Sequence, residues 1–147
     1  MVTEWRIPLR VRYGEVDRMG IVYYANYFDW FTQGRTELLR QSGTAYREIE
    51  GQGLLLPVLS AACRYHRPYG YDDEIDIVTS ARISPTRLRC EYRLEQDGVL
   101  LAEGYTEHAF VRAADMRPVN AARQFPEIFA QFSHLPPLRA GDRSAQG

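Results

Sequence analysis

The feature that most restricts the fold is one long stretch of helical spacing, followed almost entirely by segments that alternate like strands. In NYFDWFTQGRTELLRQSG, apolar residues recur at helical intervals at Tyr27, Phe31 and Leu38. Asn26 is a suitable N-cap, and the Ser-Gly pair that ends at Gly43 is a suitable C-terminal stop. Aromatic residues are more numerous here than one apolar stripe requires, so the sequence predicts one long helix with much of its surface covered.

Strand-like alternation occupies most of the remaining sequence. In WRIPLRVRY the apolar residues fall on one side and the arginines on the other, which predicts a half-buried strand, and Pro8 favours an edge position. The segments predicted as strands are residues 5–13, 54–66, 74–83, 88–95 and 99–112. Residues 84–86 and 96–98 have turn composition, so we expect tight hairpins between antiparallel neighbours. Short helical segments are expected at residues 44–50 and 124–132.

Together these segments predict an α+β fold. A sheet with one apolar face needs a cover, and the only long cover in this sequence is the aromatic helix. Leu88, Tyr92 and Leu94 alternate with charged residues and are expected to face that helix. We therefore expect an antiparallel sheet of about five strands wrapped around one long central helix. Residues 1–134 are expected to form a single domain, and residues 135–147, rich in Pro and small polar residues, a disordered tail.

The composition excludes several function classes. Hydrophobic residues make up 45% of the 147 residues and charged residues 25%, which is the balance of a folded soluble domain. The formal net charge is −1, so the chain has no global electrostatic footprint for nucleic acid. All 18 basic residues are arginine, which removes Schiff-base chemistry and the lysine of a P-loop. No apolar run reaches the length of a signal peptide or a membrane span, and we expect a cytoplasmic protein.

The cysteines and histidines form no disulfide or metal pattern. Cys63 and Cys90 are far apart and belong to no paired-cysteine motif, which favours free thiols in a reducing compartment. His66, His108 and His134 show no i, i+4 spacing and do not cluster with the cysteines. We therefore expect no metal site, and we expect the first two histidines at most at the rim of a site.

The chemistry that remains centres on Asp17. No G-x-S-x-G or G-x-G-x-x-G motif occurs, which removes the serine-hydrolase elbow and the dinucleotide fingerprint. Gly20 allows a sharp turn after Asp17, and the long helix begins soon afterwards, so its unpaired N–H groups face the same region. Such donors stabilise an oxyanion while a carboxylate attacks a carbonyl or activates water. Because Asp is a weak base with an ordinary pKa of about 3.9, a thioester suits it better than an amide.

The stretch YGEVDRMGIVYYANY, from Tyr13 to Tyr27, resembles the signature of the hotdog-fold acyl-CoA thioesterases of the 4-hydroxybenzoyl-CoA thioesterase family. The similarity continues through RTELLR, YDDEIDI and DGVLLAEG to about Phe129. The first motif is the specific one, and the later ones mainly support the fold. The resemblance implies a hotdog fold and hydrolysis of an acyl-CoA thioester, with coenzyme A as part of the substrate and no other cofactor.

The resemblance also assigns site residues by position. Asp17 matches the family's catalytic aspartate, which is nucleophile or general base in different members. Tyr24 matches a position that is histidine in one branch and tyrosine in the 4-hydroxybenzoyl branch, where the backbone N–H polarises the thioester carbonyl. The residues expected to line the substrate site are Tyr13, Gly20, Val22, Tyr23 and Tyr27. Arg87 and Arg89 are expected to bind coenzyme A.

The family further implies a homo-oligomer with its active site at a dimer interface, commonly within a tetramer. Two alternatives stay open: a thioesterase acting on an acyl carrier protein, and a non-catalytic acyl-CoA-binding protein. A dehydratase on the same scaffold would need a histidine near the helix, and none occurs before His66. The acyl group is also open, as is the choice between nucleophile and general base for Asp17.

Several residues have simpler interpretations. Asp17 itself has the spacing of a turn residue beside glycine. Glu15, on an extended segment, is expected to end a strand and face water. Glu37 is expected to be solvated or ion-paired, and Asp72 and Asp73 to form a turn. Aromatic residues at helical or strand spacing are more often core or subunit interface than pocket, so both interpretations stay open for the tyrosines of the first motif.

Overall fold

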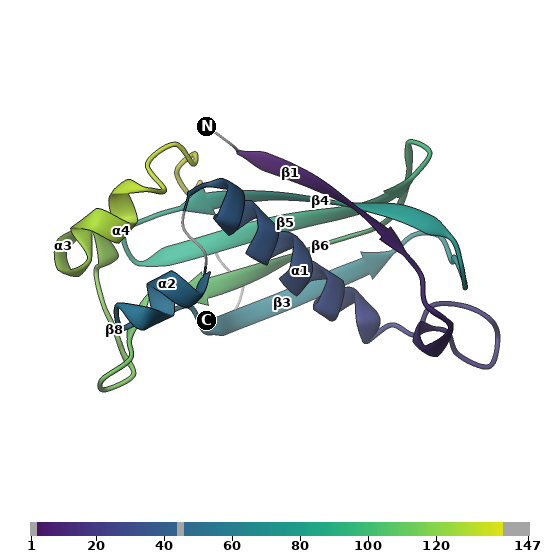
Figure 1. Ribbon diagram of the computed structural model, residues 1–147, viewed down its shortest axis with the longest axis horizontal. Coiled ribbons are helices and arrows are strands. Elements are labelled where there is room, and N and C mark those ends of the chain that lie inside the picture. The colour runs from purple at the N-terminus through teal and green to yellow at the C-terminus, as the bar shows by residue number, and fades with distance from the viewer. Residues whose placement is uncertain (1–2, 44–45, 140–147) are drawn as a thin grey trace.

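The computed structural model describes residues 3–43 and 46–139. Its main body is a five-stranded antiparallel sheet in the order β1-β4-β5-β6-β3, with helix α1 (Asn26–Gln41) lying across one face (Figure 1). The strands are β1 (Glu4–Arg10), β3 (Val58–Tyr65), β4 (Glu74–Ile83), β5 (Arg87–Gln96) and β6 (Val99–Ala109). The predicted α+β arrangement of a sheet around one long helix is confirmed. Within these described ranges, no helix is long and apolar enough to cross a membrane.

Short elements complete the fold. Three two-residue strands, β2 (Leu54–Leu55), β7 (Val111–Arg112) and β8 (Arg117–Pro118), form a small second sheet. The short helices are η1 (Tyr13–Glu15), α2 (Tyr46–Gly51), α3 (Ala121–Gln124) and α4 (Pro126–Ala130). The run predicted as one strand at residues 54–66 is therefore two strands, interrupted at Pro57, which has no N–H for a ladder. Residues 44 and 45 of the predicted second helix lie outside the described residues.

Strands β1 and β3 form the edges of the main sheet. Pro8 of β1 lies opposite Asp76 of β4. Because β1 is an edge strand, no neighbouring strand on its outer side requires an N–H from it, and the predicted edge position is confirmed. The hairpins predicted between β4 and β5 and between β5 and β6 are also confirmed. In the second of these, Asp97 and Gly98 have φ of 51° and 79°, the left-handed conformation of a tight two-residue turn.

The core lies between α1 and the sheet. Trp30, Phe31 and Leu38 of α1 are fully buried, and the Phe31 ring stacks on Tyr92 of β5 with centroids 4.2 Å apart. The predicted inward face of β5 is buried at every second residue, while the arginines and glutamates between them are partly exposed. The apolar residues at helical spacing in α1 therefore pack against the alternating apolar residues of the sheet in one layer.

Gly34 allows α1 to approach β4 closely. A Cβ at this position would occupy the space of Thr79 Oγ1 and lie 3.0 Å from Ile77 Cγ2. Gly34→Ala is expected to lower the free energy of unfolding by about 1 to 3 kcal/mol, although alanine is the better helix former. Gly51→Ala in α2 is the control, because nothing lies within 4 Å of its added Cβ. Denaturant unfolding of both variants measures this, and an undiminished stability of Gly34→Ala would contradict the close approach.

The domain boundary predicted at residue 134 is corrected, because residues 135–138 pack and pair with the domain instead of belonging to a disordered tail. Leu135 is buried, and the Ile83 N–H at the end of β4 donates to the Pro136 carbonyl oxygen (3.0 Å). Leu138 N in turn donates to the Ile83 carbonyl oxygen (3.0 Å). Pairing with backbone groups at the end of β4 thus orders a segment whose composition favours disorder. Residues 140–147 of the predicted tail lie outside the described residues.

The prediction that His108 lies at most at a rim is wrong, because it is fully buried in β6. Its Nδ1 is 2.9 Å from the Leu56 carbonyl oxygen, and its Nε2 is 2.9 Å from Thr106 Oγ1. The Thr106 hydroxyl is 2.6 Å from the Tyr92 hydroxyl, to which Arg35 Nη1 donates (3.1 Å). Burial, reinforced by the Arg35 charge, lowers the pKa of His108 to about 4, so the ring is neutral at pH 7.

Candidate functional site

The loop between β1 and α1 folds back on the segment that precedes β4 (Figure 1). Val22 N donates to the Tyr69 carbonyl oxygen (2.9 Å), and Ile21 forms a β-bridge with Gly70. Gly20 has φ of 77°, so the turn predicted after Asp17 does use the left-handed conformation that glycine adopts freely. The loop is therefore fixed by backbone pairing at the end of the sheet.

Asp17 shapes this turn with one carboxylate oxygen. Its Oδ1 accepts hydrogen bonds from Met19 N (2.8 Å) and Ile21 N (3.2 Å), so the turn interpretation of Asp17 is confirmed. In the described part of the chain, no donor is bonded to Oδ2, and the side chain is partly exposed. The two oxygens are thus available for different tasks: one orients the carboxylate, and the other is open to a substrate or a water.

Two backbone N–H groups precede helix α1. The helix begins at Asn26, and neither Tyr24 N nor Ala25 N has an acceptor among the described residues. Unpaired donors at this end of a helix, aligned with its positive dipole end, attract a partly negative oxygen. Tyr24 itself is 60% exposed.

A pocket of about 270 Å³ opens beside these groups. One wall comes from the loop and the first turn of α1, with Ile21, Val22, Tyr24 and Tyr27. The other wall is residues 65–68, at the end of β3. Three of the predicted site residues therefore line one pocket, and Asp17 is bonded to Ile21 in its wall.

The wall at residues 65–68 was missed by the sequence interpretation, apart from His66, which was expected at most at the rim of a site. Its residues are Tyr65, His66, Arg67 and Pro68. They come near α1 because β3 pairs with β6 and runs towards the loop, a tertiary contact that no local motif reports. The Tyr65 ring meets the Tyr27 ring edge-on at 4.7 Å between centroids. An exposed aromatic residue at a strand end, followed by the Arg-Pro pair, is the one local signal of this wall.

Tyr27 and Tyr65 of the pocket stay protonated near neutral pH. Burial raises the pKa of Tyr65 to about 12 and raises the pKa of Tyr27. Burial likewise raises the pKa of the Cys63 thiol to about 11, which leaves it a poor nucleophile. Nε2 of His66 lies 2.7 Å from Oε2 of Glu103, and Glu103 lines a different pocket. Asp17, bonded to Ile21 in the wall, and His66, which lines the pocket, are therefore the candidate groups for a base or nucleophile here.

Glu15 does not face water, contrary to the sequence prediction. It is only 6% exposed, because the chain leaves β1 at Arg10 and turns through η1, which points Glu15 inward. Its Oε1 accepts from Arg12 N (2.7 Å), and its Oε2 accepts from the indole Nε1 of Trp30 (3.0 Å). The expected strand alternation stops before this residue, so the two-residue period no longer decides which way the side chain points.

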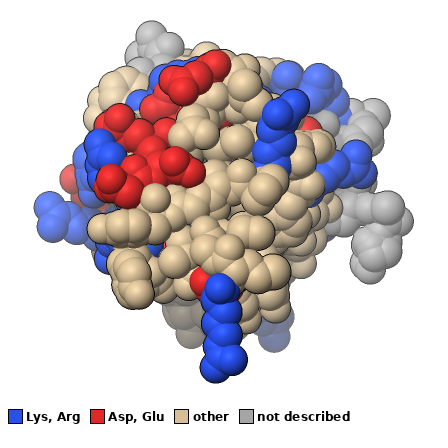
Figure 2. All heavy atoms as spheres, turned by 90° about the vertical axis from the view of Figure 1, so that its right-hand side faces the viewer, with Lys and Arg blue, Asp and Glu red and all other residues tan. Residues whose placement is uncertain are grey.

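The remaining predicted substrate residues, Tyr13, Gly20 and Tyr23, are not among the residues that line the pocket. Tyr13 is 78% exposed and meets Tyr71 edge-on, and Tyr23 is half exposed; neither lines the pocket. Gly20 supports the turn that bears Asp17. Figure 2 shows this end of the molecule as a broad uncharged surface with acidic side chains gathered on one side and arginines spaced around it.

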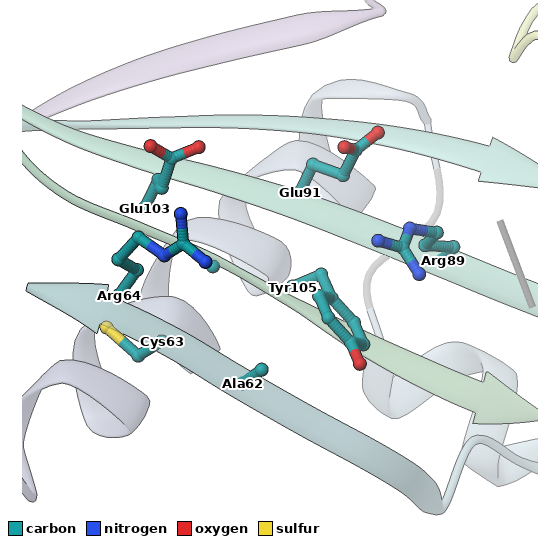
Figure 3. Close-up of a pocket in the computed structure, with 8 residues that line it drawn as sticks. Ala62, Cys63, Arg64, Arg89, Glu91, Glu103 and Tyr105 are labelled. Atoms are coloured by element: carbon teal, nitrogen blue, oxygen red, sulfur yellow. The ribbon is translucent and has the colours of Figure 1, made fainter. Parts of the chain in front are cut away.

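Arg87 and Arg89, the predicted coenzyme A contacts, begin β5 at the other end of the sheet. They adjoin the last residue of β4, whereas the candidate site adjoins the first, and a ten-residue strand spans about 30 Å. Arg89 lies in a pocket of about 360 Å³ on the sheet, with its guanidinium 3.9 Å from the Tyr105 ring centroid (Figure 3). Its Nη1 is 3.0 Å from Glu107 Oε1. Within one chain these arginines do not reach the Asp17 pocket.

Three acidic residues behave as predicted. Glu37 pairs with Arg40 one turn further along α1. Asp72 has φ of 70°, and Asp73 Oδ2 accepts from Gly70 N (2.9 Å), so this pair forms a turn. None of these three residues lines the pocket.

Comparison with known proteins connects this arrangement to a family. Residues 11–133 match the model of the thioesterase-like superfamily. An acyl-CoA thioesterase from Haemophilus influenzae, YbgC, is 32% identical over 131 residues, which is 87% of this chain and 93% of that protein.

Solved structures agree on the fold. A DHNA-CoA thioesterase from Staphylococcus aureus superposes with a TM-score of 0.83 at 26% identity, covering 88% of this chain and 89% of that one. A hypothetical protein from Thermus thermophilus superposes with a TM-score of 0.81 at 28% identity, covering 92% and 99%. The residues that match the family model, 11–133, include the loop, α1 and strands β3 to β6 of the main sheet.

Proposed function

The chain is an enzyme that belongs to the thioesterase-like superfamily and has its hotdog fold, and we propose that it hydrolyses an acyl-CoA thioester at the Asp17 pocket. One observation supports this most strongly. Within the described residues, Oδ2 of Asp17 and the N–H of Tyr24 have no hydrogen-bond partner, and both belong to the loop that lines part of a pocket of about 270 Å³. The names of the relatives, which include acyl-CoA thioesterase, agree with this substrate class.

The geometry supports a simple mechanism. The thioester carbonyl oxygen accepts from Tyr24 N–H, and such a donor is typically worth about 2.7 to 4 kcal/mol in the transition state. Asp17 Oδ2 either attacks the carbonyl carbon or removes a proton from a water that attacks it. The carbon–sulfur bond breaks, and coenzyme A leaves as a thiolate that takes up a proton. If Asp17 attacks, a mixed anhydride forms, and water hydrolyses it to the free acid and the restored carboxylate.

The two roles of Asp17 leave different isotope patterns. In a single turnover in oxygen-labelled water, attack of water on the Asp17 carbon of an anhydride places label in the Asp17 side chain. A general-base route places label only in the released acid. Label found by mass spectrometry in the peptide that contains Asp17 therefore identifies the nucleophilic route.

We also propose that the site is completed by a second copy of the chain. Strand β3 pairs only with β6 within residues 3–43 and 46–139, so its outer edge is open to another strand. Val58, Leu59 and Tyr65 along β3 are each about half exposed, and the end of this strand lines the pocket. A second copy is also the route by which Arg87 and Arg89 could contact coenzyme A. Native mass spectrometry is expected to show a dimer or tetramer, and a monomer at micromolar concentration would contradict this.

A panel of acyl-CoA thioesters tests the activity. Short, long, branched and aromatic acyl groups are offered to the purified protein, and release of the free thiol is followed. At least one is expected to be hydrolysed with kcat/KM of about 10⁴ M⁻¹s⁻¹ or more. Thioesters of an acyl carrier protein are offered in competition, and preference for them would replace coenzyme A with the carrier protein. Tight binding of acyl-CoA without turnover across the panel would instead identify a non-catalytic binding protein.

A further inference from the structure

The direction of the Tyr24 N–H is set by the peptide group that it shares with the Tyr23 carbonyl. The Tyr23 carbonyl oxygen accepts from Asn26 N (3.0 Å) and from Asn26 Nδ2 (3.1 Å). In a trans peptide the N–H points opposite to the C=O, because the group is planar. Two donors from Asn26 hold the carbonyl towards the start of α1, and the N–H of Tyr24 therefore points away from the helix.

The Asn26 side chain is itself fixed by Glu15. Its Nδ2 donates a second hydrogen bond to the Glu15 carbonyl oxygen (2.9 Å), so one amide group bridges two carbonyls. The same Glu15 oxygen accepts from Tyr23 N (2.8 Å). Tyr23 is thus held at both of its backbone polar groups. Asn26, predicted as an N-cap, is instead the first helical residue, with Ala25 before it, and its side chain donates backwards to the loop.

The Glu15 side chain anchors this arrangement in the core. Its carboxylate accepts from Arg12 N (2.7 Å), Trp30 Nε1 (3.0 Å) and, at 3.4 Å, Arg12 Nη2. Trp30 is fully buried one turn into α1, and Arg12 follows β1. A buried carboxylate is costly unless donors surround it, and here the donors come from two different elements. Glu15 therefore ties the strand end, the loop and the helix into one unit.

We propose that Glu15 and Asn26 are positioning residues for hydrolysis, which hold the Tyr23–Tyr24 peptide so that the Tyr24 N–H faces the thioester carbonyl. This inference rests on the function proposed above. Neither residue lines the pocket, so each acts through the peptide group and not on the substrate. A purely structural role predicts lost stability, whereas a positioning role predicts weaker polarisation of the bound carbonyl.

The stretching frequency of the bound thioester carbonyl measures that polarisation directly. Asp17→Asn protein, which holds an acyl-CoA without rapid turnover, is loaded with an isotope-labelled thioester, and the carbonyl stretch is measured by difference infrared spectroscopy. The stretch is expected to lie below its value in water, because a donor lengthens the C=O bond. Adding Asn26→Ala is expected to remove most of this shift. Ile128→Ala, in α4 and buried, destabilises the fold elsewhere and is expected to leave the shift intact.

The outcomes separate the two proposals. If no shift occurs with Asp17→Asn alone, the proposed role of Tyr24 in the function fails. If the shift occurs and persists in both Asn26→Ala and Glu15→Gln, the positioning role is overturned and the function stands. Glu15→Gln keeps the side-chain shape but turns an amide group towards Arg12 N or Trp30 Nε1, so it tests the anchor even if Asn26→Ala folds poorly.

Kinetics of the same substitutions with Asp17 restored give a second measurement. Because misalignment of a single oxyanion donor weakens transition-state binding more than binding of the thioester itself, kcat is expected to fall about ten- to a hundred-fold with a much smaller change in KM. The double variant is expected to lose no more than the worse single variant, since both act on one peptide. A multiplicative loss, or a loss matched by Ile128→Ala, would contradict a shared positioning role.

Discussion

Replacing Asp17 with Asn is expected to lower kcat for thioester hydrolysis by about 10²- to 10⁴-fold while the protein folds normally. Asn keeps the Oδ1 that accepts from Met19 N and Ile21 N, so the turn has no reason to change. It replaces Oδ2 with an amide nitrogen, which neither attacks a carbonyl nor takes a proton from water. Steady-state release of coenzyme A and thermal unfolding, measured on one preparation, test both halves of this expectation.

Asp115→Asn is the matched control. Asp115 also accepts a backbone N–H two residues on, from Arg117 (3.2 Å), but it lies in the turn between β7 and β8. The same chemical change at a comparable turn is expected to leave kcat unaltered. Full activity of Asp17→Asn would mean that this carboxylate only shapes a turn, and equal losses in both variants would point to a general effect on folding.

The second large effect concerns stability in acid. His108 is neutral in the fold, with a pKa of about 4, against an ordinary value of about 6.5 in the unfolded chain. Between these values the unfolded state binds more protons, so stability is full above pH 6.5 and is lost as the pH falls towards 4. The loss from this one group is about 2 kcal/mol between pH 7 and pH 5, and on the order of 3 kcal/mol by pH 4.

Other groups titrate in the same pH range, so the test compares the pH dependence of stability between the protein and a variant that lacks His108. The charged group facing the ring is Arg35 of α1, reached through Tyr92 and Thr106, and it opposes protonation throughout. His108→Gln removes the titrating ring and is expected to flatten the decline between pH 7 and pH 5, whatever its cost at pH 7. Urea unfolding at several pH values measures both slopes, and parallel slopes would show that His108 does not contribute.

Periodicity made the sheet and the central helix predictable. The alternation around Tyr92 and the helical spacing of Phe31 placed the two rings that stack in the core. Asp17 was identifiable because its turn is local, with Gly20 and the start of α1 close in sequence. Features that depend on one short segment were thus accessible before the fold was known.

Features made by distant segments were not accessible in the same way. Glu15 points inward because the Trp30 indole and the Arg12 backbone meet it there, and no local period reports those donors. His108 has the polarity of a surface residue, yet it lies on the inward face of β6 with Leu56 as partner. The pocket wall at residues 65–68 likewise depends on strand pairing. Tertiary hydrogen bonds decided each of these cases.

The structure of Asp17→Asn protein bound to a slowly hydrolysed acyl-CoA tests the central claim most directly. The thioester carbonyl oxygen is expected about 3 Å from Tyr24 N, with the carbonyl carbon facing the atom that replaces Oδ2 of Asp17. The acyl group is expected between Val22 and Tyr27 on one side and residues 65–68 on the other. A thioester bound with its carbonyl away from Tyr24, or in the pocket beside Arg89 and Tyr105, would contradict the account.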